Sequence, residues 1–335
     1  MECPQYMELV GADMARVEAL LKSPMPGQDP RMTQAIEGLI ESGGKRLRPA
    51  LALLSSHLCQ ADIDQTVYVA AGIELLHTAT LIHDDLIDGA LVRRGTPTLN
   101  SYLPLELTIL IGDFLFAHSA ALVGETEHVR IGRAFADTLS TISNGEVQQM
   151  FSRCDPYARL TRAAYKRWIL AKTASLFALC SKAGAILAGA DEEVVTALHE
   201  YGIHLGMAFQ IVDDVLDFAG DPKKLGKPIG EDLRQGLVTL PTLYFLETHP
   251  DHPEVMAVLT RREASRSVSG RTSQQNDGLV AAAVAAVRSS SALERALQDA
   301  RQLAQAAQDT LDGFPPSPYR DMMSELARFA VERSF

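Results

Sequence analysis

The segment ELLHTATLIHDDLID, residues 74–88, is apolar along most of its length and then ends in three aspartates. Its apolar residues recur at the spacing of a helix that packs in a protein core. Asp84 and Asp88 are four residues apart, so they lie one turn apart on the same helix face, where like charges repel. One such cluster is typical either of a solvated acidic helix end or of a metal site.

A second stretch, GMAFQIVDDVLD at residues 206–217, repeats the D-D-x-x-D pattern on another apolar helix. The repetition favours metal sites, because desolvated carboxylates must bind a cation or take up protons. Carboxylate oxygens suit a hard divalent ion, above all Mg²⁺, which shares its coordination sphere with water and substrate phosphates. We predict that the two triads face each other across an apolar cavity and bind a polyphosphate through magnesium. The predicted ligands are Asp84, Asp85, Asp88, Asp213, Asp214 and Asp217.

Positive charges are gathered at a few places along the chain. The segment SGGKRLRP, residues 42–49, places three cations between a glycine turn and a proline suited to the first turn of a helix. Cations at a helix N-terminus oppose the helix dipole, so the segment is typical of an anion site or of a merely solvated basic turn. Arg93 and Arg94 follow the first triad closely, whereas Lys172 and Lys227 indicate little when taken singly.

Composition excludes several classes of function. The chain of 335 residues carries 31 basic and 42 acidic residues, a net charge of −11, which argues against holding nucleic acid by bulk attraction. The best candidate for a membrane span, Leu107–Val123, is interrupted by Asp113 and His118. The N-terminus has no secretory signal pattern, and four scattered cysteines suit a reducing compartment. We therefore expect a cytoplasmic protein with neither a transmembrane segment nor a nucleic-acid partner.

Helical periodicity runs through almost the whole chain, and no pair of alternating apolar runs predicts a sheet. We expect one all-α domain over residues 1–335, a single large bundle of ten or so helices, with a mobile Ser/Arg-rich loop at about 261–277. The clearest expected helices cover residues 67–87, 130–150, 165–188, 192–218 and 281–311. Glycine and proline predict helix breaks at residues 24–27, 42–44, 95–97, 220–222 and 313–316.

Taken in order, these motifs resemble those of the trans-isoprenyl diphosphate synthases of the bacterial medium- and long-chain polyprenyl type. The resemblance covers nearly the whole chain. It rests on both aspartate motifs, the basic segment 43–49, Arg93-Arg94-Gly95, Gly112-Asp113, Gly145-Glu146, Lys172-Thr173, Phe209-Gln210, Gly226-Lys227, Thr239-Leu240-Pro241 and residues 329–333. It implies an isoprenoid-synthase bundle around a central cavity, a homodimer, and Mg²⁺-dependent condensation of isopentenyl diphosphate with an allylic diphosphate.

The resemblance also implies roles for single residues. Asp84, Asp88 and Asp213 would be the direct magnesium ligands among the six catalytic aspartates. The diphosphate of isopentenyl diphosphate would be held by Lys45, Arg48, His77 and Arg94. The allylic diphosphate would be held or faced by Arg93, Lys172, Thr173, Gln210 and Lys227, with Lys172 also counted as catalytic. One position departs from the family pattern, because Leu237 follows Gly236 where a lysine is frequent.

Product length depends on the helix that carries the first motif. In short-chain members of the family, bulky aromatic residues four or five places before the first aspartate close the pocket. Here those places hold Thr80 and Ala79, with Leu76 about one turn further on, so we predict a longer tunnel and a product beyond C20. The alternative is that Ala79 is a close helix-packing position.

Three alternatives belong to other classes. A di-iron bundle is suggested by Glu74-x-x-His77, whose i, i+3 spacing is typical of that class, and by the same spacing at Glu125 and His128. A terpene cyclase would share the bundle but carry a different second motif. A non-catalytic subunit would bind prenyl diphosphates without turnover.

Overall fold

The computed structural model describes residues 6–25, 27–41, 44–93, 95–152, 161–219, 229–265 and 273–332. The chain divides into two compact units, each built from three segments. Unit 1 comprises Met1–Ser140, Leu176–Ile203 and Ala307–Leu326, and unit 2 comprises Thr141–Ser175, His204–Ala306 and Ala327–Phe335. The all-α class is confirmed, while the single-domain expectation stays a prediction.

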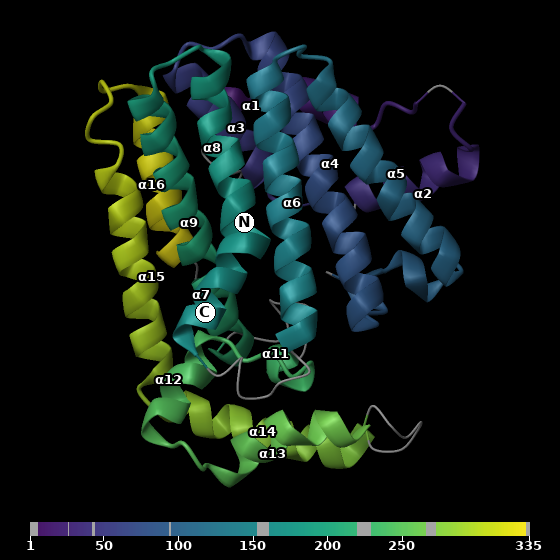
Figure 1. The fold of residues 1–335 in the computed structure, drawn as a ribbon, viewed down its shortest axis with the longest axis vertical. Coiled ribbons are helices and arrows are strands. Elements are labelled where there is room, and N and C mark those ends of the chain that lie inside the picture. The colour runs from purple at the N-terminus through teal and green to yellow at the C-terminus, as the bar shows by residue number, and fades with distance from the viewer. Residues whose placement is uncertain are drawn as a thin grey trace. The chain divides into compact units, whose positions relative to one another are not determined.

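Unit 1 is organised around one buried helix, α4 (Ile63–Asp88), whose residues between Thr66 and Leu76 are almost all buried. A helix that is apolar on every side has to be surrounded by other helices, and α5 packs beside it (Figure 1). The other helices that contribute to unit 1 are α1 (Tyr6–Leu21), α2 (Pro30–Glu41), α3 (Leu47–Leu58), α5 (Leu105–Gly124), α6 (Val129–Ser152), α8 (Ser175–Leu187), α9 (Glu192–Ala219), α15 (Ala292–Asp309) and α16 (Pro318–Glu332).

A close approach between α4 and α5 positions the end of α4 that carries the first aspartate motif. The His83 ring lies against Gly112 of α5, where an added Cβ would come within 2.3 Å of the His83 Nε2. Only glycine leaves room for this ring. Because His83 directly precedes Asp84, the contact fixes the rotation of α4 at the motif.

A short hairpin follows α4, although the sequence analysis predicted no sheet. Helix α4 ends at Asp88 and is followed by Gly89, whose φ of 67° suits glycine. Strands β1 (Val92–Arg93) and β2 (Thr96–Pro97) then pair antiparallel on either side of Gly95, and the short helix η1 (Leu99–Ser101) follows. The prediction was wrong because two-residue strands are too short to show alternation.

Unit 2 contains the remaining helices and parts of α6, α9, α15 and α16. Its own elements are α7 (Arg162–Ile169), the π-helical turn η2 (Leu170–Ala174), α11 (Glu231–Arg234), α12 (Leu240–Thr248), α13 (Pro253–Ser265) and α14 (Ser273–Arg288). Helices α13 and α14 pack side by side (Figure 1). Helix α12 starts at Leu240-Pro241, where a proline in the first turn needs no backbone N–H partner.

Two expected helices are interrupted. The segment expected as one helix over 281–311 breaks between α14 and α15, where the Ser290 hydroxyl accepts from the backbone N–H of Ala292 and donates to the Val287 carbonyl. Serine competes for backbone partners in this way and favours helix ends. The helix expected over 165–188 is interrupted by the π-helical turn η2. Counted over the described residues, the structure has more helices than the ten or so expected.

The breaks expected at 95–97 and 313–316 are confirmed, because one helix ends before each and another begins after it. Helices also end before and begin after 24–27 and 42–44, of which residues 26, 42 and 43 lie outside the described part. The break at 220–222 lies outside the described residues. Helices α13 and α14 extend into both ends of the segment expected to be a loop, 261–277, of which residues 266–272 also lie outside the described part.

Two helical segments have the length and apolar composition of a membrane span. Arg162–Leu187 is 78% buried over its most apolar window, as in the core helix of a globular protein. Leu105–Gly124 is 39% buried, and Leu107 and Leu110 are among its exposed side chains. These two candidate membrane spans rest on composition and length alone. The absence of a transmembrane segment therefore stays a prediction.

Candidate active site

The three aspartates of the first motif have different surroundings. Asp84 and Asp88 are half-buried, whereas Asp85 is 6% exposed. Arg93 of the hairpin binds the Asp85 Oδ1 with Nε and Nη2, each at 2.8 Å. Burial raises the pKa of Asp85, and the charge and hydrogen bond of Arg93 oppose that rise. The pair therefore stabilises the hairpin against α4, and Asp84 and Asp88 are the two carboxylates of the motif that keep more accessible surface.

A partly exposed stripe runs along the same face of α4. His77, Thr80, Asp84 and Asp88 are all half-buried and recur at helical spacing. The Thr80 hydroxyl donates to the His77 carbonyl at 2.7 Å. Of the three residues expected to set product length, Leu76 and Ala79 have no exposed surface, so Thr80 is the one that borders accessible space.

The basic loop, residues 44–48, presents its three cations in different directions. Lys45 is exposed, and the Arg48 guanidinium carbon lies 5.0 Å from the centre of the Phe177 ring. Arg46 is half-buried and forms ion pairs with Glu18 and with Glu74, the latter at 3.0 Å. Arg94 lies outside the described residues.

The Arg46–Glu74 pair bears on the di-iron alternative. Glu74 is 5% exposed, and its carboxylate binds the Arg46 guanidinium. Within the described ranges no group of three or more His, Cys, Asp or Glu side chains is arranged to hold a metal ion. The Glu74 carboxylate of this Glu-x-x-His pair is thus engaged by an ion pair in the helix packing.

The second motif also divides its aspartates by burial. Asp213 is half-buried, while Asp214 is 2% and Asp217 1% exposed. The Asp217 Oδ2 accepts at 3.1 Å from the backbone N–H of Asp232, which lies in the first turn of the short helix α11. Asp213 is therefore the member of this motif with accessible surface, and it corresponds in the pattern to Asp84 of the first motif.

Asp214 belongs to a chain of buried hydrogen bonds within unit 2. Its two carboxylate oxygens accept from the Tyr165 hydroxyl at 2.6 Å and from the Gln210 amide at 2.8 Å. The Thr173 hydroxyl donates in turn to the Gln210 carbonyl oxygen at 2.7 Å. Burial raises the pKa of Asp214 to about 7, against the lowering effect of Tyr165 and Gln210. We interpret Thr173 and Gln210 as residues that join η2 to α9.

Lys172 lies in the π-helical turn η2, which the sequence periodicity did not predict. Such turns occur frequently at functional sites. The Lys172 ammonium pairs with Glu146 of α6 at 2.9 Å. An added Cβ on Gly145 would lie 2.5 Å from the Ala171 Cβ, so glycine permits α6 to approach η2 closely. Gly145-Glu146 and Lys172-Thr173 thus form one local arrangement, and Lys227 lies outside the described residues.

The structure adds Tyr165 to the candidate site, because its hydroxyl donates to the buried Asp214 carboxylate. We expect Tyr165→Phe to lower the free energy of unfolding by about 1–3 kcal/mol, because Asp214 then loses a hydrogen-bond donor. Urea unfolding checks this value, with Tyr102→Phe as the control on a tyrosine that is 59% exposed. Equal stability of the Tyr165 and Tyr102 variants would contradict the role of Tyr165. The sequence carried no signal for it beyond a tyrosine seven places before Lys172.

The donor set fits a hard divalent cation. Asp84 and Asp88 are half-buried carboxylates one turn apart on α4, and Asp213 on α9, taken by itself, is half-buried too. Mg²⁺ uses only one or two protein carboxylates beside water and phosphate oxygens. A few carboxylates therefore suffice for an ion that completes its coordination with substrate.

Known proteins similar to this chain share both its sequence and its fold. The family model described as "Polyprenyl synthetase" matches residues 29–273. Heptaprenyl diphosphate synthase component 2 of Geobacillus stearothermophilus is 34% identical, over 96% of both chains. Octaprenyl diphosphate synthase of Haemophilus influenzae is 32% identical, over 100% of this chain and 98% of its own length.

A solved structure agrees with these relatives. The polyprenyl synthase of Caulobacter crescentus, crystallised with calcium and isoprenyl diphosphate, has a TM-score of 0.90 and 36% identity, covering 99% of this chain and 98% of its own. Both the sequence matches and this structure extend over almost the entire length of the chain. The chain therefore belongs to the polyprenyl synthetase family.

Proposed function

We propose that this protein is a magnesium-dependent polyprenyl diphosphate synthase that adds isopentenyl diphosphate to an allylic diphosphate. The observation that carries the proposal is the division within the aspartate motifs, in which Asp84, Asp88 and Asp213 keep accessible surface while Asp85, Asp214 and Asp217 are buried. Family membership supplies the reaction class, prenyl transfer with chain elongation.

The difficult step is the breaking of the allylic C–O bond, which leaves a diphosphate and a delocalised carbocation. Lys172 and Arg93 are cations whose positions are already fixed by Glu146 and Asp85, and preorganised charges of this kind stabilise charge that develops in the transition state. Bound Mg²⁺ supplies further positive charge to the leaving diphosphate. The calcium named with the Caulobacter protein is a hard divalent ion of the same type.

The new bond forms when the double bond of isopentenyl diphosphate attacks the carbocation. Loss of one proton then completes a product five carbons longer, with the expelled diphosphate as proton acceptor, so that no histidine or glutamate base is required. Lys45, Arg48 and His77 hold the diphosphate of isopentenyl diphosphate in this proposal. Apolar helix surfaces keep water from the carbocation.

We propose a product beyond C20. The residue four places before Asp84 is Thr80, which is small and borders accessible space on α4. The relatives described above are named for heptaprenyl and octaprenyl products. The substitution of Leu237 for the frequent lysine leaves the allylic diphosphate with one cation fewer, and Lys172 and Arg93 carry that part of the binding.

Product analysis tests the function against its alternatives. The protein is incubated with isopentenyl diphosphate, Mg²⁺ and allylic primers of C5, C10, C15 and C20, and the products are sized. We expect linear polyprenyl diphosphates longer than the primer. Cyclised hydrocarbon would instead indicate a terpene cyclase, and an absence of turnover would indicate a non-catalytic subunit.

We also propose a cytoplasmic homodimer. An exposed apolar surface on α5 supports the dimer. Four apolar side chains are exposed along this helix, namely Leu107, Leu110, Ala117 and Ala121. A two-fold dimer uses the same surface patch on both subunits. Cytoplasmic location is supported by the scattered cysteines. Sedimentation of the purified chain at twice the monomer mass tests the dimer.

A further inference from the structure

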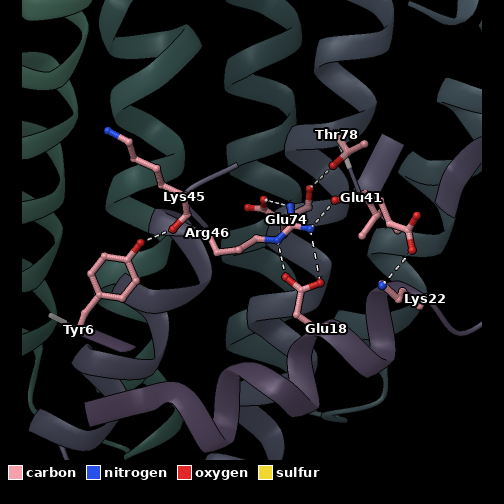
Figure 2. Close-up of polar contacts among 9 residues, drawn as sticks. Tyr6, Glu18, Lys22, Glu41, Lys45, Arg46, Glu74 and Thr78 are labelled. Carbon is pink, nitrogen blue, oxygen red and sulfur yellow. Dashed lines mark hydrogen bonds and ion pairs between the residues drawn. The ribbon is translucent and has the colours of Figure 1, made fainter. Parts of the chain in front are cut away.

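Arg46 lies at the centre of the basic loop, residues 44–48, yet its side chain points into the protein. Its Nε donates to Glu18 of α1 at 2.5 Å, and its Nη1 donates to Glu74 of α4 at 3.0 Å. Its Nη2 donates to the carbonyl of Ile40 near the end of α2 at 2.8 Å. Three helices therefore converge on one guanidinium at the start of α3 (Figure 2).

These contacts commit the Arg46 charge to the protein. The Arg46 side chain is 15% exposed and the Glu74 side chain 7%. Burial acts to lower the pKa of Arg46, but the hydrogen bond to Glu18 and the charge of Glu74 outweigh it, so the pKa is raised. A guanidinium that donates to two carboxylates and a carbonyl has its planar fork already engaged. Arg46 therefore differs in role from the other two cations of the loop.

The backbone of the loop is held in a conformation that its sequence alone would not favour. Arg46 has φ 48° and ψ 33°, in the left-handed region, where a non-glycine residue persists only if its surroundings fix it. The Tyr6 hydroxyl donates to the Lys45 carbonyl and gives the loop another point of attachment. Figure 2 shows the Lys45 side chain leaving the loop away from the Arg46 guanidinium. Arg48, two residues later, is in the first turn of α3, and its guanidinium lies against the Phe177 ring of α8.

We propose that Arg46 is a positioning residue for the diphosphate of isopentenyl diphosphate, held in place by Glu18 and Glu74. It fixes the loop conformation from which Lys45 and Arg48 reach the diphosphate, and it does not contact the substrate itself. This inference rests on the proposed function, because it assigns the isopentenyl diphosphate subsite to that loop.

Arg46→Lys tests the assignment, because lysine keeps the charge but cannot bridge two carboxylates and a carbonyl in a planar fork. We expect the KM for isopentenyl diphosphate to rise about tenfold or more, while kcat and the KM for the allylic diphosphate stay within about twofold. The matched control is Glu41→Gln, which removes an exposed ion pair between Glu41 of α2 and Lys22, the residue that directly follows α1. It should leave all three constants unchanged.

Tyr6→Phe is the second variant, and it keeps the test decisive if Arg46→Lys does not fold. It removes the hydroxyl that donates to the Lys45 carbonyl, and we expect the KM for isopentenyl diphosphate to rise about two- to fivefold. Calorimetric binding of isopentenyl diphosphate measures the same change without turnover.

The outcomes separate this inference from the proposed function. A wild-type protein that neither binds isopentenyl diphosphate nor elongates primers would refute the proposed function itself. An active wild type whose folded variants keep its KM for isopentenyl diphosphate would overturn the role of Arg46. An equal rise in the KM for both substrates would also overturn the role of Arg46, because such a rise would indicate general destabilisation of the protein.

Discussion

Asp84→Ala is expected to lower kcat by a factor on the order of 10²–10³ while the helical fold stays intact, because it removes a carboxylate that would hold the cation that stabilises the negative charge on the leaving diphosphate. Asp84 is half-buried, whereas the buried Asp85 pairs with Arg93, so we expect the fold to tolerate removal of the Asp84 carboxylate better than removal of the Asp85 carboxylate. Asp213→Ala, the equivalent change in the second motif, should have an effect of similar size. Steady-state kinetics and circular dichroism check both parts of the expectation.

The matched control for this experiment is Asp64→Ala. Asp64 lies on the same helix α4, but its side chain is 80% exposed and pairs with Arg16. An exposed ion pair of this kind contributes little, so the control should retain wild-type kcat. Near-normal turnover in Asp84→Ala, with the same result in Asp213→Ala, would contradict the assignment of the metal ligands.

Thr80→Phe is expected to shorten the product to C20 or less. Thr80 lies one turn before Asp84 on the same face of α4 and borders accessible space, so an aromatic ring there stands in the path of a growing prenyl tail. The kcat for the first condensation should change little, because the reacting groups are not altered. Chromatographic sizing of the products with a C15 primer measures the shift.

Ala79→Phe separates blockage of the tail from overpacking. Ala79 has no exposed surface, so a phenylalanine there must displace neighbouring side chains and cost about 1–3 kcal/mol of stability. We expect this variant to lose stability more than Thr80→Phe does. A Thr80→Phe protein of wild-type stability that still made wild-type product lengths would show that the tail follows another path.

The elements that carry the motifs could be predicted because their patterns are strong. Helices α4 and α9 extend over long, periodic apolar runs, and the expected ranges 67–87 and 192–218 lie within the observed Ile63–Asp88 and Glu192–Ala219. The difference in burial between Asp84 and Asp85 also follows from helix geometry, since the side chains of adjacent helical residues point in directions about 100° apart.

The partners of the buried residues could not be predicted, because they come from other elements of the chain. Asp85 is paired by Arg93 of the hairpin, and Asp214 is held by Tyr165 of α7. The π-helical turn η2 keeps the composition of an ordinary helix, so periodicity did not reveal it. The break at Ser290 was missed because apolar residues continue at helical spacing on both sides of it.

The most direct test of the central claim is metal-dependent binding of an allylic diphosphate. Farnesyl thiodiphosphate, an analogue that ionises poorly, is titrated into the wild-type protein in a calorimeter, once with Mg²⁺ and once with EDTA. The expected result is binding with Mg²⁺, loss of that binding in EDTA, and weakened binding by Asp84→Ala in the presence of Mg²⁺. Equal affinity with and without the metal would contradict it.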